Sequence, residues 1–157
     1  MANKQQISFS LAFLAVALFV LAGQATARRE ILNAEVGGAA NPKDAVEMIL
    51  NELISSTQRV KNKVSVLGNS QMVQACDKAY ASSLESLNKA MGLVKGTAGI
   101  DTGNLKASIT AALHGYDNCD YAFAESTRPS PFIPNNANLK SLVSQCLELT
   151  SKLANNN

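Results

Sequence analysis

The residues of this chain that could do chemistry are three cysteines and a single histidine. They are Cys76, Cys119, Cys146 and His114, in a chain of 157 residues. A histidine base needs a nucleophile and an orienting acid, and no recognisable motif supplies them to His114. The chain also lacks a phosphate-binding loop, a nucleophile elbow and any metal-ligand spacing. We therefore expect no catalysis, no metal and no cofactor.

The composition predicts one domain with an aliphatic core. Hydrophobic residues make up 46% of the chain and aromatic residues only 5%, with a formal net charge of +2. Because acids and bases nearly balance, neither a disordered acidic tail nor a strongly basic nucleic-acid binder fits the chain. We expect no nucleic-acid partner.

The first 27 residues are predicted to be a signal peptide. Residues 1–10 are polar with one lysine, and residues 11–22 form an uncharged apolar run that is too short to span a bilayer comfortably. Ala25 and Ala27 then place small residues at the two positions that a signal peptidase reads. A buried core helix and a membrane anchor are the alternatives. Cleavage after Ala27 would give a secreted chain without a membrane contact, in an oxidising compartment where structured cysteines pair.

Four later segments carry apolar residues at alternating spacings of three and four, which is typical of amphipathic helices. The segments are residues 46–67, with Leu67 as the last apolar position, and residues 73–94, 105–123 and 139–153. No segment shows the alternation of a β-strand. Because short connections join the segments, we predict an all-α, up-and-down antiparallel four-helix bundle.

Capping and breaking residues set the expected ends of these helices. Asn41 and Pro42 cap and open the first helix, Gly68 ends it, and Asp101 opens the third helix. Three of the four prolines lie in residues 126–135. We therefore expect a rigid loop there, followed by a shorter fourth helix.

These boundaries predict the domain organisation. Residues 1–27 are the signal peptide, residues 28–41 an N-terminal segment, and residues 42–157 the bundle. The N-terminal segment combines a few aliphatic residues with two adjacent glycines. A short helix packed on the bundle and a loose segment are both open interpretations.

Two of the cysteines are placed to form a disulfide. Cys76 and Cys119 lie on the inward stripes of the second and third helices, each about 21 residues from a turn near residues 96–99. In an antiparallel pair they sit at matching heights, so Cys76–Cys119 is the preferred bridge, which would stabilise the fold by roughly 4 kcal/mol. Cys146 is left over. Its stripe position favours a buried free thiol over an intermolecular bridge or a reactive nucleophile.

The chain resembles the plant invertase and pectin methylesterase inhibitor family over about residues 43–153. The matching features are Cys76 followed by Tyr80, residues 105–112, residues 117–120 around Cys119, and residues 135–142. The resemblance implies a secreted four-helix bundle that inhibits a cell-wall or vacuolar carbohydrate-active enzyme by forming a protein–protein complex. It implies no catalysis. The family's characteristic bridge between the second and third long helices would be Cys76–Cys119, which agrees with the geometric argument.

The chain departs from the family pattern at two points. The family usually begins with a helical hairpin closed by its own disulfide, and residues 28–41 contain no cysteine. We therefore expect a monomer. Some invertase-directed members use a Pro-Lys-Phe tripeptide, whereas Asp44 follows Pro42 and Lys43 here. This difference favours a plant pectin methylesterase as the partner, with acid invertase as the alternative.

The resemblance also implies a location and leaves one alternative from another class of protein. The expected location is the apoplast or cell wall, with the vacuole as the alternative. A helical bundle can also carry a lipid or another small ligand between its helices. A large cavity in the structure would support that carrier hypothesis.

Eight polar residues on the second and third helices are the candidate contacts for an enzyme partner. Helical geometry turns them away from the core, and the resemblance implies that this side covers the enzyme's substrate cleft. The alternative is a merely solvated face. The residues are Lys78, Ser82, Glu85, Lys89, Thr110, His114, Asp117 and Tyr121.

For two of these eight residues we have a specific expectation. Tyr121 is the sharpest candidate because an exposed tyrosine combines a large apolar body with a hydroxyl. His114 is expected to be a solvated surface residue that makes binding depend only modestly on pH.

Overall fold

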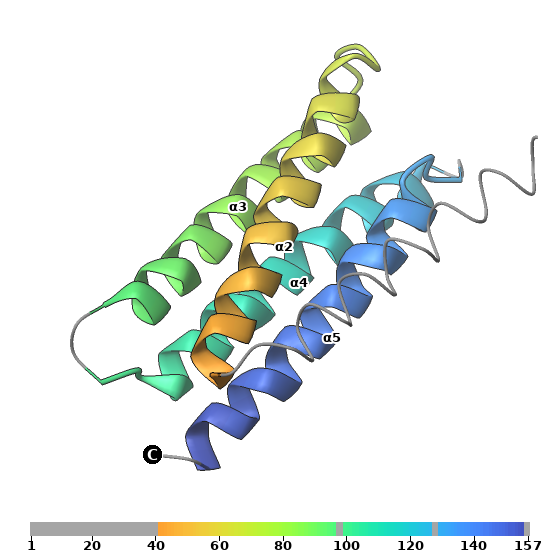
Figure 1. Cartoon of the computed structure of the whole chain (residues 1–157). Helices are drawn as coiled ribbons and strands as arrows, with labels where there is room; N and C mark the ends of the chain where they lie inside the picture. Colours follow the sequence, from red (N-terminus) through yellow and green to blue (C-terminus); the bar gives the residue numbers. More distant parts are fainter. Residues whose placement is uncertain (1–40, 97–98, 127–128, 156–157) are drawn as a thin grey trace, which may run out of the picture. The chain divides into compact units, whose positions relative to one another are not determined.

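The computed structural model describes residues 41–96, 99–126 and 129–155, and four long helices make up most of them (Figure 1). They are α2 (Pro42–Ser65), α3 (Gln71–Lys95), α4 (Thr102–Glu125) and α5 (Ile133–Asn155). This part of the chain contains no strand, so the predicted all-α class is confirmed. The predicted signal peptide and residues 28–40 lie outside the described residues.

The four helices form an up-and-down bundle in which each helix packs against two neighbours. Helices α2 and α4 each contact both α3 and α5, so the chain visits the corners of the bundle in order. Figure 1 shows the α2–α3 and α4–α5 connections at one end and the α3–α4 connection at the other. The predicted bundle is confirmed.

Local capping chemistry fixes the first turns of α2 and α4. The Asn41 side-chain oxygen accepts a hydrogen bond from the Lys43 backbone N–H at 3.0 Å, and Pro42 opens the helix, where a backbone N–H is not needed. At α4, the Asp101 carboxylate accepts hydrogen bonds from the backbone N–H and the side-chain amide of Asn104. These two hydrogen bonds lower the pKa of Asp101 below its usual value. Both predicted helix starts are confirmed.

Three details of the expected helices differ in the structure. Helix α2 ends at Ser65 and the chain turns at Gly68 with a φ of 92°, so Leu67 leaves the core stripe and is 49% exposed. Helix α5 begins at Ile133, inside the residues expected to form a loop, because Pro134 is tolerated in a first turn. With 23 residues, α5 is also nearly as long as α2 and α4, which have 24 each.

Side chains from all four helices fill the interior of the bundle. Among the apolar positions spaced by three and four, Leu84, Leu142 and Leu149 are half-buried, Leu67 is exposed and the others are buried. Phe132, just before α5, packs its ring edge-on against Tyr80, with ring centroids 6.2 Å apart. The hydrophobic periodicity therefore predicted most of the core.

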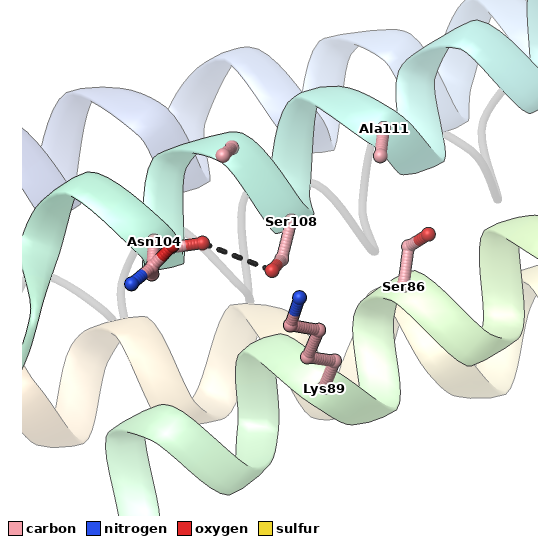
Figure 2. A pocket seen from close by; sticks show the side chains of 6 residues that line it. Ser86, Lys89, Asn104, Ser108 and Ala111 are labelled. Carbon is pink, nitrogen blue, oxygen red and sulfur yellow. Dashed lines mark hydrogen bonds between the residues drawn. The ribbon is translucent and has the colours of Figure 1, made fainter.

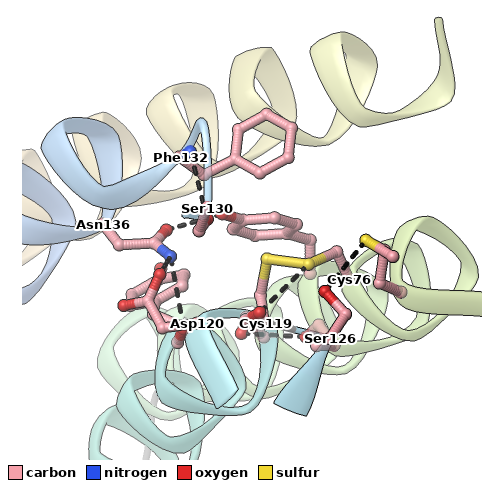
Figure 3. The surroundings of a disulfide bond; sticks show 12 residues. Cys76, Cys119, Asp120, Ser126, Ser130, Phe132 and Asn136 are labelled. Atoms are coloured by element: carbon pink, nitrogen blue, oxygen red, sulfur yellow. Dashed lines mark hydrogen bonds between the residues drawn. A yellow bond between two sulfur atoms is a disulfide. The ribbon is translucent and has the colours of Figure 1, made fainter. Parts of the chain in front are cut away.

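The Cys76–Cys119 disulfide forms as predicted and links α3 to α4, with the two Cα atoms 4.3 Å apart (Figure 3). Cys146 is a free, buried thiol on α5. Burial raises the pKa of Cys146 from 9.0 to about 12. The thiol therefore stays protonated near neutral pH, which agrees with an inert core residue and argues against a nucleophile.

Candidate partner-binding face

Small residues allow α3 and α4 to approach each other closely. A Cβ atom on Gly115 would collide with the Ser83 Oγ atom and would lie 2.7 Å from the Ala79 carbonyl oxygen, so glycine is the residue that fits this crossing. The Ser83 hydroxyl donates to carbonyl oxygens of both helices, 3.1 Å away at Ala79 and 2.9 Å away at Ala112. Together with the disulfide, these contacts make α3 and α4 a tightly packed unit, which we call the α3–α4 pair.

The four predicted contact residues of α3 lie on the outer surface of the α3–α4 pair. Lys78, Ser82, Glu85 and Lys89 are all exposed. None of the four side chains forms a hydrogen bond or an ion pair with another residue that the structure describes. They are therefore open to a partner.

The four predicted contact residues of α4 divide into two groups. His114 and Tyr121 are exposed, Tyr121 by 65%. Thr110 and Asp117 are half-buried, and the Asp117 carboxylate binds Lys140 Nζ of α5 at 2.6 Å. Because residues spaced by three and four share a helix face, this stripe leans toward α5 rather than toward α3. The structure therefore does not bring all eight candidates into one patch.

Lys140 connects two acidic residues of α4 to α5, a contact that the sequence analysis missed. Its Nζ atom lies 2.6 Å from Asp117 Oδ1 and 3.0 Å from Asp120 Oδ2. Burial lowers the pKa of Lys140, but hydrogen bonds and attraction from the two aspartates outweigh burial and raise it overall. A lone lysine on a helix gives no sequence signal for its partner on another helix.

Asn136 of α5 joins three helices inside the bundle, close to the disulfide (Figure 3). Its Nδ2 donates to Asp120 Oδ1 at 2.7 Å and to the Tyr116 carbonyl oxygen at 3.2 Å. Its Oδ1 accepts a hydrogen bond from the Tyr80 hydroxyl of α3 at 2.5 Å. Every hydrogen-bonding atom of this buried side chain thus has a partner, which is what a buried amide requires.

The Tyr116 hydroxyl connects α4 to α2. It lies 2.7 Å from the Thr57 hydroxyl of α2, and either oxygen can donate. Burial raises the pKa of Tyr116 from 10.0 to about 12. Burial also raises the pKa of Tyr80, despite the opposing effect of the hydrogen bond that Tyr80 donates to Asn136. These hydroxyls are structural groups that stay protonated at neutral pH.

A small cavity lies on the outer surface between α3 and α4 (Figure 2). Its volume is about 150 Å³, and we call it the α3–α4 notch. Its lining residues are Ser86, Lys89, Asn104, Ala107, Ser108 and Ala111. Of these, Lys89 was predicted from the sequence as a candidate partner contact. The spacing of Ala107 and Ala111 by four residues on one exposed helix face is the signal that could have indicated the rest.

The outer surface of α3 and α4 is the candidate binding surface of the described residues. Within them, no three histidine, cysteine, aspartate or glutamate residues gather as a metal site would require. No helix among them is long and apolar enough to cross a membrane. What the outer surface of α3 and α4 presents to a partner is hydroxyls, charges and one large aromatic ring.

A family model and a solved structure are similar to this chain. The model of the family described as plant invertase/pectin methylesterase inhibitor matches residues 29–149. A similar solved structure is the crystal structure of a pectin methylesterase inhibitor from Arabidopsis thaliana, with a TM-score of 0.65 and 18% sequence identity. The match covers 79% of this chain and 85% of that one, and at this identity it shows a shared fold. No curated protein matches the sequence.

Proposed function

The chain belongs to the plant invertase/pectin methylesterase inhibitor family, and on this premise we propose that it binds and blocks a plant pectin methylesterase in a protein–protein complex. The family model spans α2, α3, α4 and most of α5, and this match is the observation that carries the proposal. The match supports an inhibitory role. The members of the family are inhibitors and not enzymes, so the protein acts on its partner by binding alone.

The outer surface of the α3–α4 pair is the part of the bundle best suited to cover an enzyme's cleft. A disulfide and a close helix crossing hold it in place. A surface that is already ordered loses little conformational entropy on binding. The enzyme would contact Lys78, Ser82 and Glu85. These side chains form no hydrogen bond or ion pair within the described residues that binding would have to break. Inhibition then follows because the bundle keeps the substrate out of the cleft.

The first turn of α2 supports pectin methylesterase over acid invertase as the target. Some invertase-directed members of the family use a Pro-Lys-Phe tripeptide, and this chain has Asp44 in place of the phenylalanine. Asp44 is exposed in the first turn of α2. A negative charge there favours the helix N-terminus. The position therefore serves the helix and offers no aromatic ring to an invertase.

A small-ligand carrier is the alternative from another class of protein. Ligand pockets for drug-sized molecules have volumes of roughly 300–1,000 Å³. The α3–α4 notch is smaller, at about 150 Å³, and four of its lining residues are exposed at the surface. The notch is therefore too small and too exposed to enclose a ligand of that size.

The location belongs to the same proposal. The apolar run at residues 11–22 and the small residues Ala25 and Ala27 support secretion to the apoplast or cell wall, with the vacuole as the alternative. Expression of the full chain in plant cells, with N-terminal sequencing of the protein in the medium, tests this. A secreted chain that begins at Arg28 is expected, and a protein that stays in the cell with an intact N-terminus would contradict it.

Inhibition assays test the function directly. The mature protein, residues 28–157, is refolded under oxidising conditions and added to a plant pectin methylesterase and to an acid invertase in parallel. Saturable inhibition of the pectin methylesterase alone is expected. Inhibition of the invertase alone would make acid invertase the target in place of the pectin methylesterase. Inhibition of neither enzyme by a protein with a folded helical spectrum would refute the proposed function.

A further inference from the structure

Two polar groups of the α3–α4 notch have no partner in the described part of the chain. They are the Lys89 ammonium and the Ser86 hydroxyl, both on α3. Figure 2 shows the Lys89 side chain extending toward Ser108 of α4, so that its charged end lies at the notch. A lysine held there without a counter-ion offers its charge to an incoming group.

The remaining polar groups of the notch are already bound. The Ser108 hydroxyl donates to the Asn104 carbonyl oxygen at 2.9 Å, and the Asn104 side-chain amide donates to Asp101 Oδ2 at 2.6 Å. The donors left for a ligand are therefore Lys89 and Ser86. An occupant that matches them accepts hydrogen bonds and carries a negative charge.

Two acidic groups lie near the notch, and neither neutralises Lys89. The Asp101 carboxylate is held by Asn104 at the N-terminus of α4, where the helix dipole offsets its charge. Glu85 lies four residues before Lys89 on α3, a spacing that permits an ion pair. The two side chains form no such pair.

The size and walls of the notch restrict what can enter. Ala107 and Ala111 of α4 form small apolar walls. A cavity of about 150 Å³ accommodates one group of roughly the size of benzene. This volume suits a single amino-acid side chain and is too small to enclose an oligosaccharide. A carboxylate on a short aliphatic stem fits best, with its methylene groups against the alanines and its oxygens on Lys89 and Ser86.

We propose that the α3–α4 notch receives an aspartate or glutamate side chain of the target enzyme, with Lys89 and Ser86 as the hydrogen-bond donors. This inference rests on the proposed function, since it names the chemistry of one contact in that complex. Among the exposed residues of α3, Lys89 is the one that lines the notch.

Two variants of the notch test this contact through the inhibition constant. Lys89→Gln removes the charge and keeps much of the stem, and Ala107→Leu fills the notch with a residue that favours helix. Each should weaken inhibition of the pectin methylesterase roughly tenfold. The matched controls are Lys63→Gln on α2 and Ala154→Leu on α5, both at exposed positions away from the notch. These should stay within about twofold of the wild-type protein.

The outcomes of this assay separate the inference from the proposed function. If the wild-type protein inhibits the enzyme and both notch variants inhibit it equally well, the inference is overturned and the proposed function stands. Loss of inhibition in the notch variants and not in the controls supports both. Circular dichroism of each variant establishes that it is folded.

A ligand titration tests the notch directly, even if the wild-type protein inhibits neither enzyme. N-acetylglutamate is titrated into the protein while the methyl NMR signals of Ala107 and Ala111 are followed. A saturable shift of both signals that disappears in Lys89→Gln supports a carboxylate site. The absence of any shift overturns it. Galacturonate is titrated in parallel, and tighter binding of this sugar acid at the same methyl groups would assign the site to a carbohydrate instead of a protein side chain.

Discussion

Helix α4 makes its two lateral interfaces from different chemistry. Toward α3 it presents Gly115 and Cys119, and a close backbone approach and a covalent bond make the contact. Toward α5 it presents Asp117 and Asp120, which bind Lys140. The first interface needs few polar side chains, whereas the second one engages the charges of α4 internally.

This difference indicates which side of the bundle is available to a partner. Small side chains on both sides of the α3–α4 crossing leave a notch, and Lys78, Glu85 and Lys89 of α3 are unpaired within the described residues. On the α5 side, the Asp117 carboxylate already has a lysine partner, so it is less available to an enzyme. The α3–α4 pair is therefore the better docking surface, although Asp117 had the right sequence spacing for one.

Loss of the disulfide removes the covalent part of the α3–α4 interface and has the largest expected effect. In the double variant Cys76→Ala/Cys119→Ala, the free energy of unfolding should fall by roughly 4 kcal/mol because the unfolded chain is no longer constrained. Urea unfolding followed by circular dichroism measures it. Cys146→Ala is the control and should cost about 1 kcal/mol. A double variant no less stable than the control would contradict the assigned role of the bridge.

Asn136→Ala breaks the polar interface of α5. The change leaves the Tyr80 hydroxyl without its partner and removes the hydrogen bonds that Asn136 donates to Asp120 and to the Tyr116 carbonyl oxygen. The free energy of unfolding should fall by about 3 kcal/mol, since buried polar groups without partners are costly. Asn138→Ala, at an exposed position of the same helix, should change it by less than about 0.5 kcal/mol. Equal effects of the two changes in chemical denaturation would refute the hydrogen-bond argument.

Gly115→Ala tests the close approach of α3 and α4. The added methyl group collides with Ser83 and must push the helices apart, so we expect a loss of about 2 kcal/mol in the free energy of unfolding. Gly92→Ala is the matched control because a Cβ atom there meets nothing within 4 Å. It should stabilise the helix by roughly 0.5–1 kcal/mol. Thermal and urea unfolding should move the two variants in opposite directions, and stabilisation by both would rule out a tight crossing.

Alkaline pH probes the α5 side of this comparison because it ionises the thiol of Cys146 on α5, whereas the disulfide-bonded cysteines do not titrate. The pKa of the Cys146 thiol rises from 9.0 to about 12 on burial, so the unfolded chain releases this proton at a lower pH than the folded chain. The stability is fully present below pH 9 and falls as the pH rises above that value. The expected loss between pH 9 and 10 is about 1 kcal/mol.

Cys146→Ala separates the thiol from other groups in this pH series. The buried tyrosines, whose ordinary pKa is 10.0, add a smaller loss of stability as the pH approaches 10. The variant should therefore lose less stability than the wild-type protein between pH 9 and 10, by about 1 kcal/mol. An unchanged decline in the variant would show that another group is responsible.

The fold could be predicted because its determinants are local in the sequence. Apolar spacing gave the four helices, Asn41 and Asp101 gave two helix starts, and matching distances from one turn gave the Cys76–Cys119 bridge. The start of α5 could not be placed from prolines alone. The same residue type that breaks a helix interior is tolerated in a first turn, so Pro134 is compatible with both a loop and a helix.

The candidate site was predicted less completely because it depends on pairs of residues from different helices. Exposure of Lys78 and Glu85 follows from the period of one helix. The engagement of Asp117 by Lys140 and the notch beside Ala107 depend on how two helices are rotated against each other. Periodicity within one segment contains no information about that rotation.

Site-specific photocrosslinking tests most directly whether the α3–α4 pair is the docking surface. A benzophenone amino acid replaces Ser82 on α3 in one protein and Ser144 on α5 in another, both at exposed positions. Each protein is irradiated with the pectin methylesterase, and covalent complexes are separated on a denaturing gel. The account predicts a crosslinked complex from position 82 and none from position 144. A complex formed from position 144 alone would contradict it and place the enzyme on α5.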